Sequence, residues 1–194
     1  KDGDPDTDYH FVPGTLKAVK WGDQERAQVM VSTATTATPF AAEPRNVLKH
    51  VLNRFHEKGM FPTVAFELEF YLLDPKRDEL GLIQPAQNPF HHRREQPATL
   101  DMESLEFYGP VLTSIRRQLE QQNIENTAIS AEMGPGQFEI NLTHHDDVLK
   151  AADETIEYQR LIKGVARDHH LEASFMAKPF ADMPGSGMHL HISL

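Results

Sequence analysis

The sequence predicts an α+β fold, because segments with the period of strands and segments with the period of helices follow one another along the chain. Every second residue is apolar in 66–73, 137–142 and 189–194, as in half-buried strands. Apolar residues three and four positions apart predict helices between Pro44 and Gly59, at 103–122 and at 147–169. Residues 133–136 contain Gly and Pro, which predicts a hairpin turn between strands at 127–132 and 137–142.

The first 42 residues predict a β region separate from the rest. Short strands are expected at 9–12, 16–21 and 26–31, and a Thr- and Ala-rich linker follows at 32–42. Three short strands make a thin core, so we expect further strands upstream, and we divide the chain into domains at 1–42 and 43–194. Because the chain begins with Lys rather than Met and stops within an apparent strand, we also expect it to be a fragment of a longer protein.

The second region should contain a long loop, two further helices and two further strands. Residues 74–100 are polar and rich in Pro and His, which predicts the loop. Gly109-Pro110 should kink or restart the helix at 103–122. A strand at 172–177 precedes a loop rich in Pro and Gly at 179–187. The helix at 147–169 is expected to bury one apolar face, made of Leu149, Ala152, Ile156, Ile162 and Val165.

The composition excludes several classes of function. A net charge of −10 without a Lys/Arg cluster argues against a nucleic-acid partner and favours cations wherever carboxylates converge. The absence of cysteine excludes disulfides, thiolate zinc sites and cysteine nucleophiles. No apolar run approaches the ~18 residues of a membrane span, and no secretory signal opens the chain. We therefore expect a soluble, cytoplasmic protein without a membrane partner.

Two carboxylates interrupt the apolar strand at 66–73. Glu67 and Glu69 should point to one face, roughly 7 Å apart at the backbone, while Leu68 and Phe70 point to the other face. Strand interiors are depleted in Glu, and an unpaired buried carboxylate is costly. We expect a divalent cation as the compensating partner.

Two further strands repeat this design. Gln137 and Glu139 share one face of 137–142, and His189 and His191 share one face of 189–194. The hairpin turn can bring Glu132 close to Glu139. Aligned in one sheet, the three strands would present four carboxylates and one or two imidazoles to a single concave surface.

Such a set of ligands suits Mg²⁺ or Mn²⁺ better than zinc, because most of the ligand atoms are oxygens. Four carboxylates exceed what one ion needs, which predicts two ions, as in phosphoryl chemistry. The alternative is that the Glu pair is the solvated face of an amphipathic sheet and the His pair is structural. We favour the metal interpretation because the pattern recurs on three strands beside Gly-rich turns.

Three segments resemble the catalytic domain of the glutamine synthetase family in order and spacing. These are FELEFYLLD at 66–74, EMGPGQFEINL at 132–142 and FMAKPFADMPGSGMHLHISL at 175–194. The stretch 2–21 also resembles the end of that family's N-terminal domain, so the resemblance covers essentially the whole chain. It implies the last part of a β-grasp domain followed by the first half of the catalytic domain, which is an antiparallel-rich sheet carrying helices.

The resemblance also implies a reaction. Members of the family phosphorylate the γ-carboxylate of glutamate with ATP, and an amine then displaces phosphate. Two Mg²⁺ or Mn²⁺ ions serve this reaction, ATP is a co-substrate, and the subunits form double rings whose active sites lie between neighbours.

The resemblance implies metal ligands at five positions of this sequence. Glu69, Glu132 and Glu139 match the ligands of the ion nearer the glutamate and the amine. Glu67 and His189 match ligands of the ion that holds the ATP phosphates.

The resemblance also implies two substrate contacts, and the sequence differs from the usual family pattern at two places. His191 matches a residue beside the nucleotide, and Gly185 matches the backbone that contacts glutamate. Pro184 stands where glutamine synthetases proper usually have Asn, and Ser130-Ala131 stands where His-His is common. Both departures favour the γ-glutamylpolyamine branch, of the γ-glutamylputrescine type.

The resemblance places the last metal-ligating Glu, the catalytic arginines and a flexible flap beyond Leu194. The chain alone is therefore expected to be inactive, and no residue within it is assigned as catalytic. The favoured function is a ligase that forms a γ-glutamyl amide from glutamate and a polyamine such as putrescine. The alternatives are a glutamine synthetase using ammonia, a non-catalytic assembly protein with the same fold, and a small metal-binding module complete in itself.

Overall fold

The computed structural model describes residues 8–33, 42–86 and 99–194. Most of the linker expected at 32–42 and the second half of the loop expected at 74–100 lie outside the described residues. The strands are β1 His10–Phe11, β2 Lys17–Val19, β3 Arg26–Gln28, β4 Val31–Ser32, β5 Thr63–Asp74, β6 Gln84–Pro85, β7 Asn126–Ala131, β8 Gln137–Leu142, β9 Glu172–Ser174 and β10 Met188–Ser193. The helices are α1 Pro44–His56, α2 Met102–Phe107, α3 Gly109–Gln121 and α4 Val148–Asp168.

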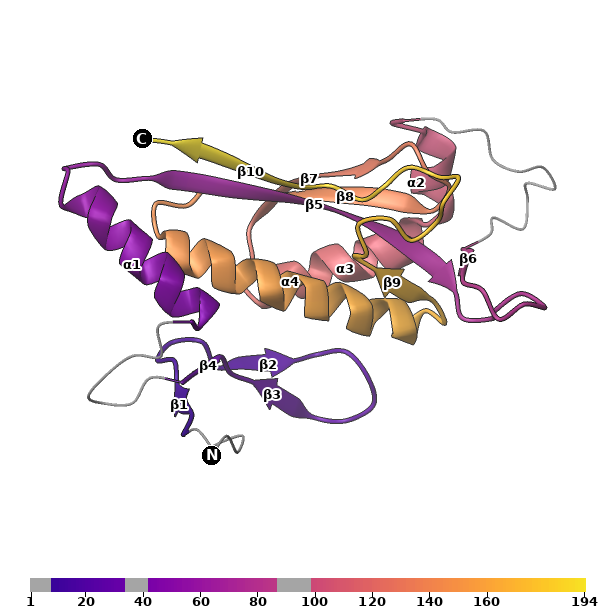
Figure 1. The fold of residues 1–194 in the computed structure, drawn as a ribbon. Coiled ribbons are helices and arrows are strands. Elements are labelled where there is room, and N and C mark those ends of the chain that lie inside the picture. Colours follow the sequence, from indigo (N-terminus) through magenta and orange to yellow (C-terminus); the bar gives the residue numbers. More distant parts are fainter. Residues whose placement is uncertain (1–7, 34–41, 87–98) are drawn as a thin grey trace, which may run out of the picture.

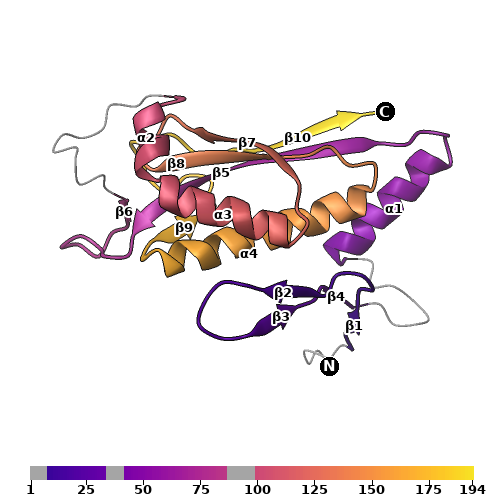
Figure 2. The ribbon, with the colours of Figure 1, turned by 180° about the vertical axis from the view of Figure 1, so that it is seen from behind.

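Three layers make up the described part of the chain (Figure 1). The sheet built on β5 is the first layer, helices α3 and α4 lie along one of its faces as the second, and the short N-terminal strands pack beneath α4 as the third. Figure 2 shows from behind that α3 and α4 run side by side below the same sheet. No helix within the described ranges covers the other face of the sheet.

Strand β5 is the central strand of the sheet. Strand β8 and then β6 pair with one edge of β5, while β10 and β9 pair with the other, and every pairing is antiparallel. Strands β7 and β8 form the predicted hairpin. An antiparallel sheet carrying helices confirms the predicted α+β class.

The alternation of β5 separates a buried face from an open face. Leu68, Phe70 and Leu72 are buried against the helices, whereas Glu67 and Glu69 point to the open face and are half-buried. The helices contribute large apolar side chains to this core, namely Ile115, Leu119, Tyr158, Leu161 and Ile162.

The predicted interruption of the second helix is confirmed. Helix α2 ends at Phe107 and α3 begins at Gly109, with Tyr108 between them. Helix α4 also matches its prediction to within a residue at each end, and Asp147 caps it by accepting a hydrogen bond from the Lys150 N–H. The apolar spacing at 147–169 and the Gly109-Pro110 pair are the sequence signals that predicted these boundaries.

The N-terminal strands differ from the prediction. The expected strand at 26–31 is two strands, β3 and β4, and the region forms two separate pairs, β2 with β3 and β1 with β4. The backbone changes partner at Met30, whose N–H donates to Thr15 Oγ1 and whose carbonyl accepts from Val12 N–H. The division of the chain between residues 42 and 43 stays a prediction.

The buried face of α4 also differs from the prediction. Ile156 is 56% exposed, whereas Asp153, Glu154 and Glu157 are buried. The helix lies between the sheet and the N-terminal strands, so it is covered on two sides (Figure 1). Each buried acid has a basic partner: Arg45 for Asp153, His145 for Glu154 and Lys17 for Glu157. Apolar periodicity cannot reveal these partners, because they come from distant segments.

Among the described residues, no helix combines the length and the apolar character that crossing a bilayer requires.

Candidate metal centre

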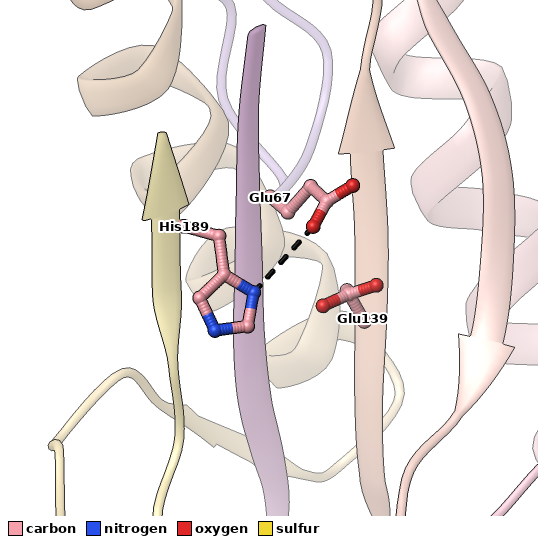
Figure 3. A group of neighbouring side chains, drawn as sticks. All are labelled: Glu67, Glu139 and His189. Atoms are coloured by element: carbon pink, nitrogen blue, oxygen red, sulfur yellow. Dashed lines mark ion pairs between the residues drawn. The ribbon is translucent and has the colours of Figure 1, made fainter. Parts of the chain in front are cut away.

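Three side chains from neighbouring strands converge on the open face of the sheet. Glu67 on β5, Glu139 on β8 and His189 on β10 each offer one ligand atom, and these atoms all lie within 4.8 Å of one another. Figure 3 shows the imidazole and the two carboxylates turned toward one another across the three strands. The register explains this, because Glu67 lies directly opposite His189, and Glu139 lies opposite Glu69.

Glu67 is held between two imidazoles. His189 Nδ1 lies 3.5 Å and His191 Nε2 lies 3.1 Å from the same carboxylate oxygen, Glu67 Oε2. The hydrogen bond from His191 is the main reason that the pKa of Glu67 is lowered. The ionised carboxylate is thus favoured where a cation would need it.

Glu69 is oriented by a neighbouring amide. Gln137 Nε2 donates to Glu69 Oε2 at 2.8 Å. The backbone N–H of Glu69 donates to the Gly187 carbonyl at 3.1 Å, which attaches the segment before β10 to the middle of β5.

Glu132 lies at the start of the hairpin turn, near the other acids. Its backbone N–H donates to the Gln137 carbonyl at 2.9 Å, and Ser130 Oγ donates to its carboxylate at 3.3 Å. Burial, followed by the negative charges of Glu139 and Glu69, raises the pKa of Glu132. The acids therefore repel one another, and a bound cation would relieve this repulsion.

The raised pKa of Glu132 predicts a pH-dependent affinity for cations. Because a proton and a cation compete for the same carboxylate, we expect Mn²⁺ binding to weaken as the pH falls through this raised pKa, by up to about tenfold per pH unit. Titration with Mn²⁺ at a series of pH values from the ordinary pKa of a Glu, about 4.3, up to neutrality, followed by electron paramagnetic resonance, measures this. Circular dichroism at each pH is the control for folding, and an affinity that does not change over this range would contradict the prediction.

The loop before β10 lies against the same group of residues. Gln137 Nε2 donates to the Gly185 carbonyl at 2.9 Å, and the Tyr71 hydroxyl donates to the Pro184 carbonyl at 2.8 Å. Burial, with a smaller contribution from the charge of Glu69, raises the pKa of Tyr71 to about 12. The hydroxyl is therefore protonated and able to donate at neutral pH.

Gly187 leaves the space that two of the candidate ligands occupy. A Cβ atom at this position would lie 2.8 Å from Glu69 Oε1 and 2.9 Å from His189 Nε2. The missing side chain of Gly187 is therefore what leaves room for these two atoms. Crowded carboxylates, one imidazole and a glycine cradle fit a hard divalent cation such as Mg²⁺ or Mn²⁺.

The three ligand atoms that lie within 4.8 Å of one another come from both of the expected sets. The 4.8 Å group combines Glu139, expected at one ion, with Glu67 and His189, expected at the other. The assignment of individual ligands to two ions stays a prediction, as do the roles of His191 and Gly185.

Two residues at the site were given no role in it from the sequence: Gln137 and Tyr71. The alternation of β8 already placed Gln137 on the same face as Glu139. Tyr71 lies two residues after Glu69 on the same face of β5, yet its apolar neighbours made it look like core. A period-two count through the whole of β5 would have found it.

The fold and the site together define an α+β protein with a carboxylate-rich candidate cation site on the open face of an antiparallel sheet. The family described as glutamine synthetase, catalytic domain, matches residues 41–194. The chain belongs to the glutamine synthetase family.

Two relatives whose names specify different amines are similar to this chain. The chain is 39% identical over 194 residues to the γ-glutamylputrescine synthetase PuuA of Escherichia coli K12, covering 99% of this chain and 41% of that protein. It is 33% identical to a glutamate–isopropylamine ligase of a Pseudomonas species, covering 93% of this chain and 39% of the relative. A solved complex of GmaS with ADP superposes with a TM-score of 0.75 at 29% identity, over 86% of this chain and 37% of that one. The chain thus spans about two fifths of the length of these relatives.

Proposed function

We propose that the full-length protein is an ATP-dependent ligase that joins the γ-carboxyl group of glutamate to an amine through γ-glutamyl phosphate. The observation that carries this proposal is the convergence of Glu67, Glu139 and His189 on one face of the sheet. The two relatives named above support it, because their names describe the joining of glutamate to putrescine and to isopropylamine. ADP in the GmaS complex supports a nucleotide co-substrate.

The site would supply electrostatic stabilisation rather than a nucleophile. Glu69, Glu132 and Glu139 would hold one Mg²⁺ or Mn²⁺ ion, and Glu67 and His189 would help to hold a second. Such ions neutralise the charge on the phosphates and on the transferring phosphoryl group. The chain itself contributes the fixed positions of these ligands.

The reaction balances in two displacements. An oxygen of the γ-carboxylate attacks the γ-phosphorus of ATP and releases ADP, which converts a poor electrophile into an acyl phosphate. The amine nitrogen then attacks the γ-carbonyl carbon, loses a proton and releases phosphate. His191 Nε2 lies 3.1 Å from Glu67 Oε2 and would stand beside the nucleotide, and Gly185 would present its backbone to the glutamate.

A polyamine such as putrescine is the acceptor that we propose. Pro184 and Ser130-Ala131 support this choice, as does the putrescine-specific name of the relative that is 39% identical. In the structure Ser130 is small and hydrogen-bonded to Glu132, and Ala131 is buried. Neither position offers an imidazole beside the acids.

The proposal also covers assembly and location. We expect the full-length protein to form a homo-oligomeric double ring and to work in the cytoplasm, where ATP is available, without nucleic-acid or membrane partners. A non-catalytic assembly protein is disfavoured, because crowded carboxylates are costly to keep without a cation. The present chain alone is expected to be inactive.

The test is ADP release by the full-length protein with glutamate, Mg²⁺ and ATP, comparing putrescine, isopropylamine and ammonia. We expect turnover with putrescine to exceed that with ammonia, and the folded Glu67→Ala/Glu69→Ala variant to lose turnover and Mn²⁺ binding together. A preference for ammonia would overturn the proposed polyamine acceptor and indicate a glutamine synthetase proper. The absence of turnover with any amine, in protein that binds Mn²⁺, would overturn the ligase.

A further inference from the structure

We propose that Gln137 is a positioning residue that locks the candidate metal ligand Glu69 and the Gly185 carbonyl into one arrangement. The inference rests on the proposed function, because it assigns Gln137 to the cation site and glutamate loop of that ligase.

Three of the four hydrogen-bonding directions of the Gln137 side-chain amide are used, including both of its N–H donors. Its Nε2 group donates to Glu69 Oε2 at 2.8 Å and to the Gly185 carbonyl at 2.9 Å, and its Oε1 accepts from the Gly134 N–H at 2.9 Å. Gln137 is only 2% exposed, so water does not substitute for these partners. A flipped amide would face two acceptors with an oxygen and one donor with an NH₂ group, so the orientation is unambiguous.

The turn before β8 is packed against this amide. A Cβ atom at Gly134 would lie 2.8 Å from Gln137 Oε1 and would overlap the Tyr71 hydroxyl at 2.1 Å. That hydroxyl in turn donates to the Pro184 carbonyl. Consecutive carbonyls of the loop, Pro184 and Gly185, are therefore anchored to the sheet by two side chains that lie opposite each other in the β5–β8 register.

The hydrogen bond from Gln137 determines which carboxylate oxygen of Glu69 stays available to a cation. With Oε2 engaged by Gln137, Oε1 is the oxygen that lies beside Gly187, a residue that His189 Nε2 also approaches. Loss of the amide would free the carboxylate to rotate and would release the Gly185 carbonyl. Partners that orient metal ligands in this way commonly contribute 10–100-fold to metal affinity.

The test compares two buried glutamines in the full-length protein. Gln137→Met removes the amide at similar volume. Gln122→Met is the matched control, because Gln122 is also 2% exposed and hydrogen-bonded, but to Ala18 and Gln28 beneath the helices. Mn²⁺ affinity is measured by electron paramagnetic resonance without substrates, thermal unfolding is measured in parallel, and KM for glutamate and kcat follow.

We expect Gln137→Met to weaken Mn²⁺ binding by about tenfold or more and to raise KM for glutamate more than it lowers kcat. Gln122→Met should lower the unfolding temperature without changing Mn²⁺ affinity. Unchanged Mn²⁺ affinity in Gln137→Met, or an equal loss in both variants, would overturn the inference. If Gln137→Met does not fold, Gln137→Asn takes its place. The Asn side chain is one methylene shorter, so its amide cannot reach Glu69 and the Gly185 carbonyl together.

The result does not depend on turnover. A wild-type protein that binds Mn²⁺ but joins no amine to glutamate would overturn the proposed ligase, while the Mn²⁺ comparison would still decide the role of Gln137.

Discussion

Gly187→Ala is expected to weaken Mn²⁺ binding by about 100-fold or more while leaving the protein folded. The new Cβ atom would lie within 3 Å of the ends of two side chains, Glu69 Oε1 and His189 Nε2. Both are flexible tips that can move aside at little cost to folding, but moving aside removes them from the cation. Gly187 has no positive φ angle, so the backbone accepts Ala without strain.

Gly109→Ala is the matched control for this variant. A Cβ atom at Gly109, the first residue of α3, meets nothing within 4 Å, so neither Mn²⁺ affinity nor stability should change. Isothermal titration with Mn²⁺ and thermal unfolding of both variants make the comparison. A Gly187→Ala protein that binds Mn²⁺ as the wild type does would show that the cation site lies elsewhere.

Lys17→Met is expected to reduce the free energy of unfolding by about 3 kcal/mol. Lys17 Nζ lies 2.5 Å from Glu157 Oε2, and the Glu157 side chain is only 5% exposed. Burial already raises the pKa of Glu157, and Lys17 is the partner that opposes this rise. Without Lys17, the buried carboxylate would face the charges of Glu154 and Asp153 alone.

The pH dependence and a double variant test the same pair. The pKa of Glu157 is raised on folding, so the folded state takes up a proton at higher pH than the unfolded state, and the stability of Lys17→Met should rise as the pH falls through that pKa. Lys17→Met/Glu157→Met should recover most of the loss, since no charge stays buried.

Lys150→Met, which removes an exposed i,i+4 partner of Glu154, should cost less than about 0.5 kcal/mol. Urea unfolding of all three variants gives these values. Similar losses in Lys17→Met and Lys150→Met would contradict the special role of the Lys17 pair.

The sequence predicted the local parts of this site well. A strand has period two, so the shared face of Glu67 and Glu69 follows from spacing alone, and a short turn fixes β7 against β8. The boundaries of α4 and the restart at Gly109 were also readable from local signals. Each of these features depends on residues close together in the chain.

The parts that failed depend on distant segments. No residue near Glu157 in the sequence indicates that Lys17 will pair with it. Ile156 was predicted to be buried because α4 was taken to have a single buried face, whereas the side chain is exposed. Similarly, the three contacts of the Gln137 amide come from β5, the hairpin turn and the loop before β10. Periodicity assigns a side chain to a face, but it does not name the partner on that face.

The position of β5 also sets an order of assembly during synthesis. Its partners on one edge, β9 and β10, follow the rest of the sheet in the chain, so a growing polypeptide carries β5 with that edge unpaired. Such an edge exposes N–H and C=O groups to other chains and promotes aggregation. Because Glu67 meets His189 only when β10 pairs with β5, this part of the candidate metal centre can form only after β10 has been synthesised.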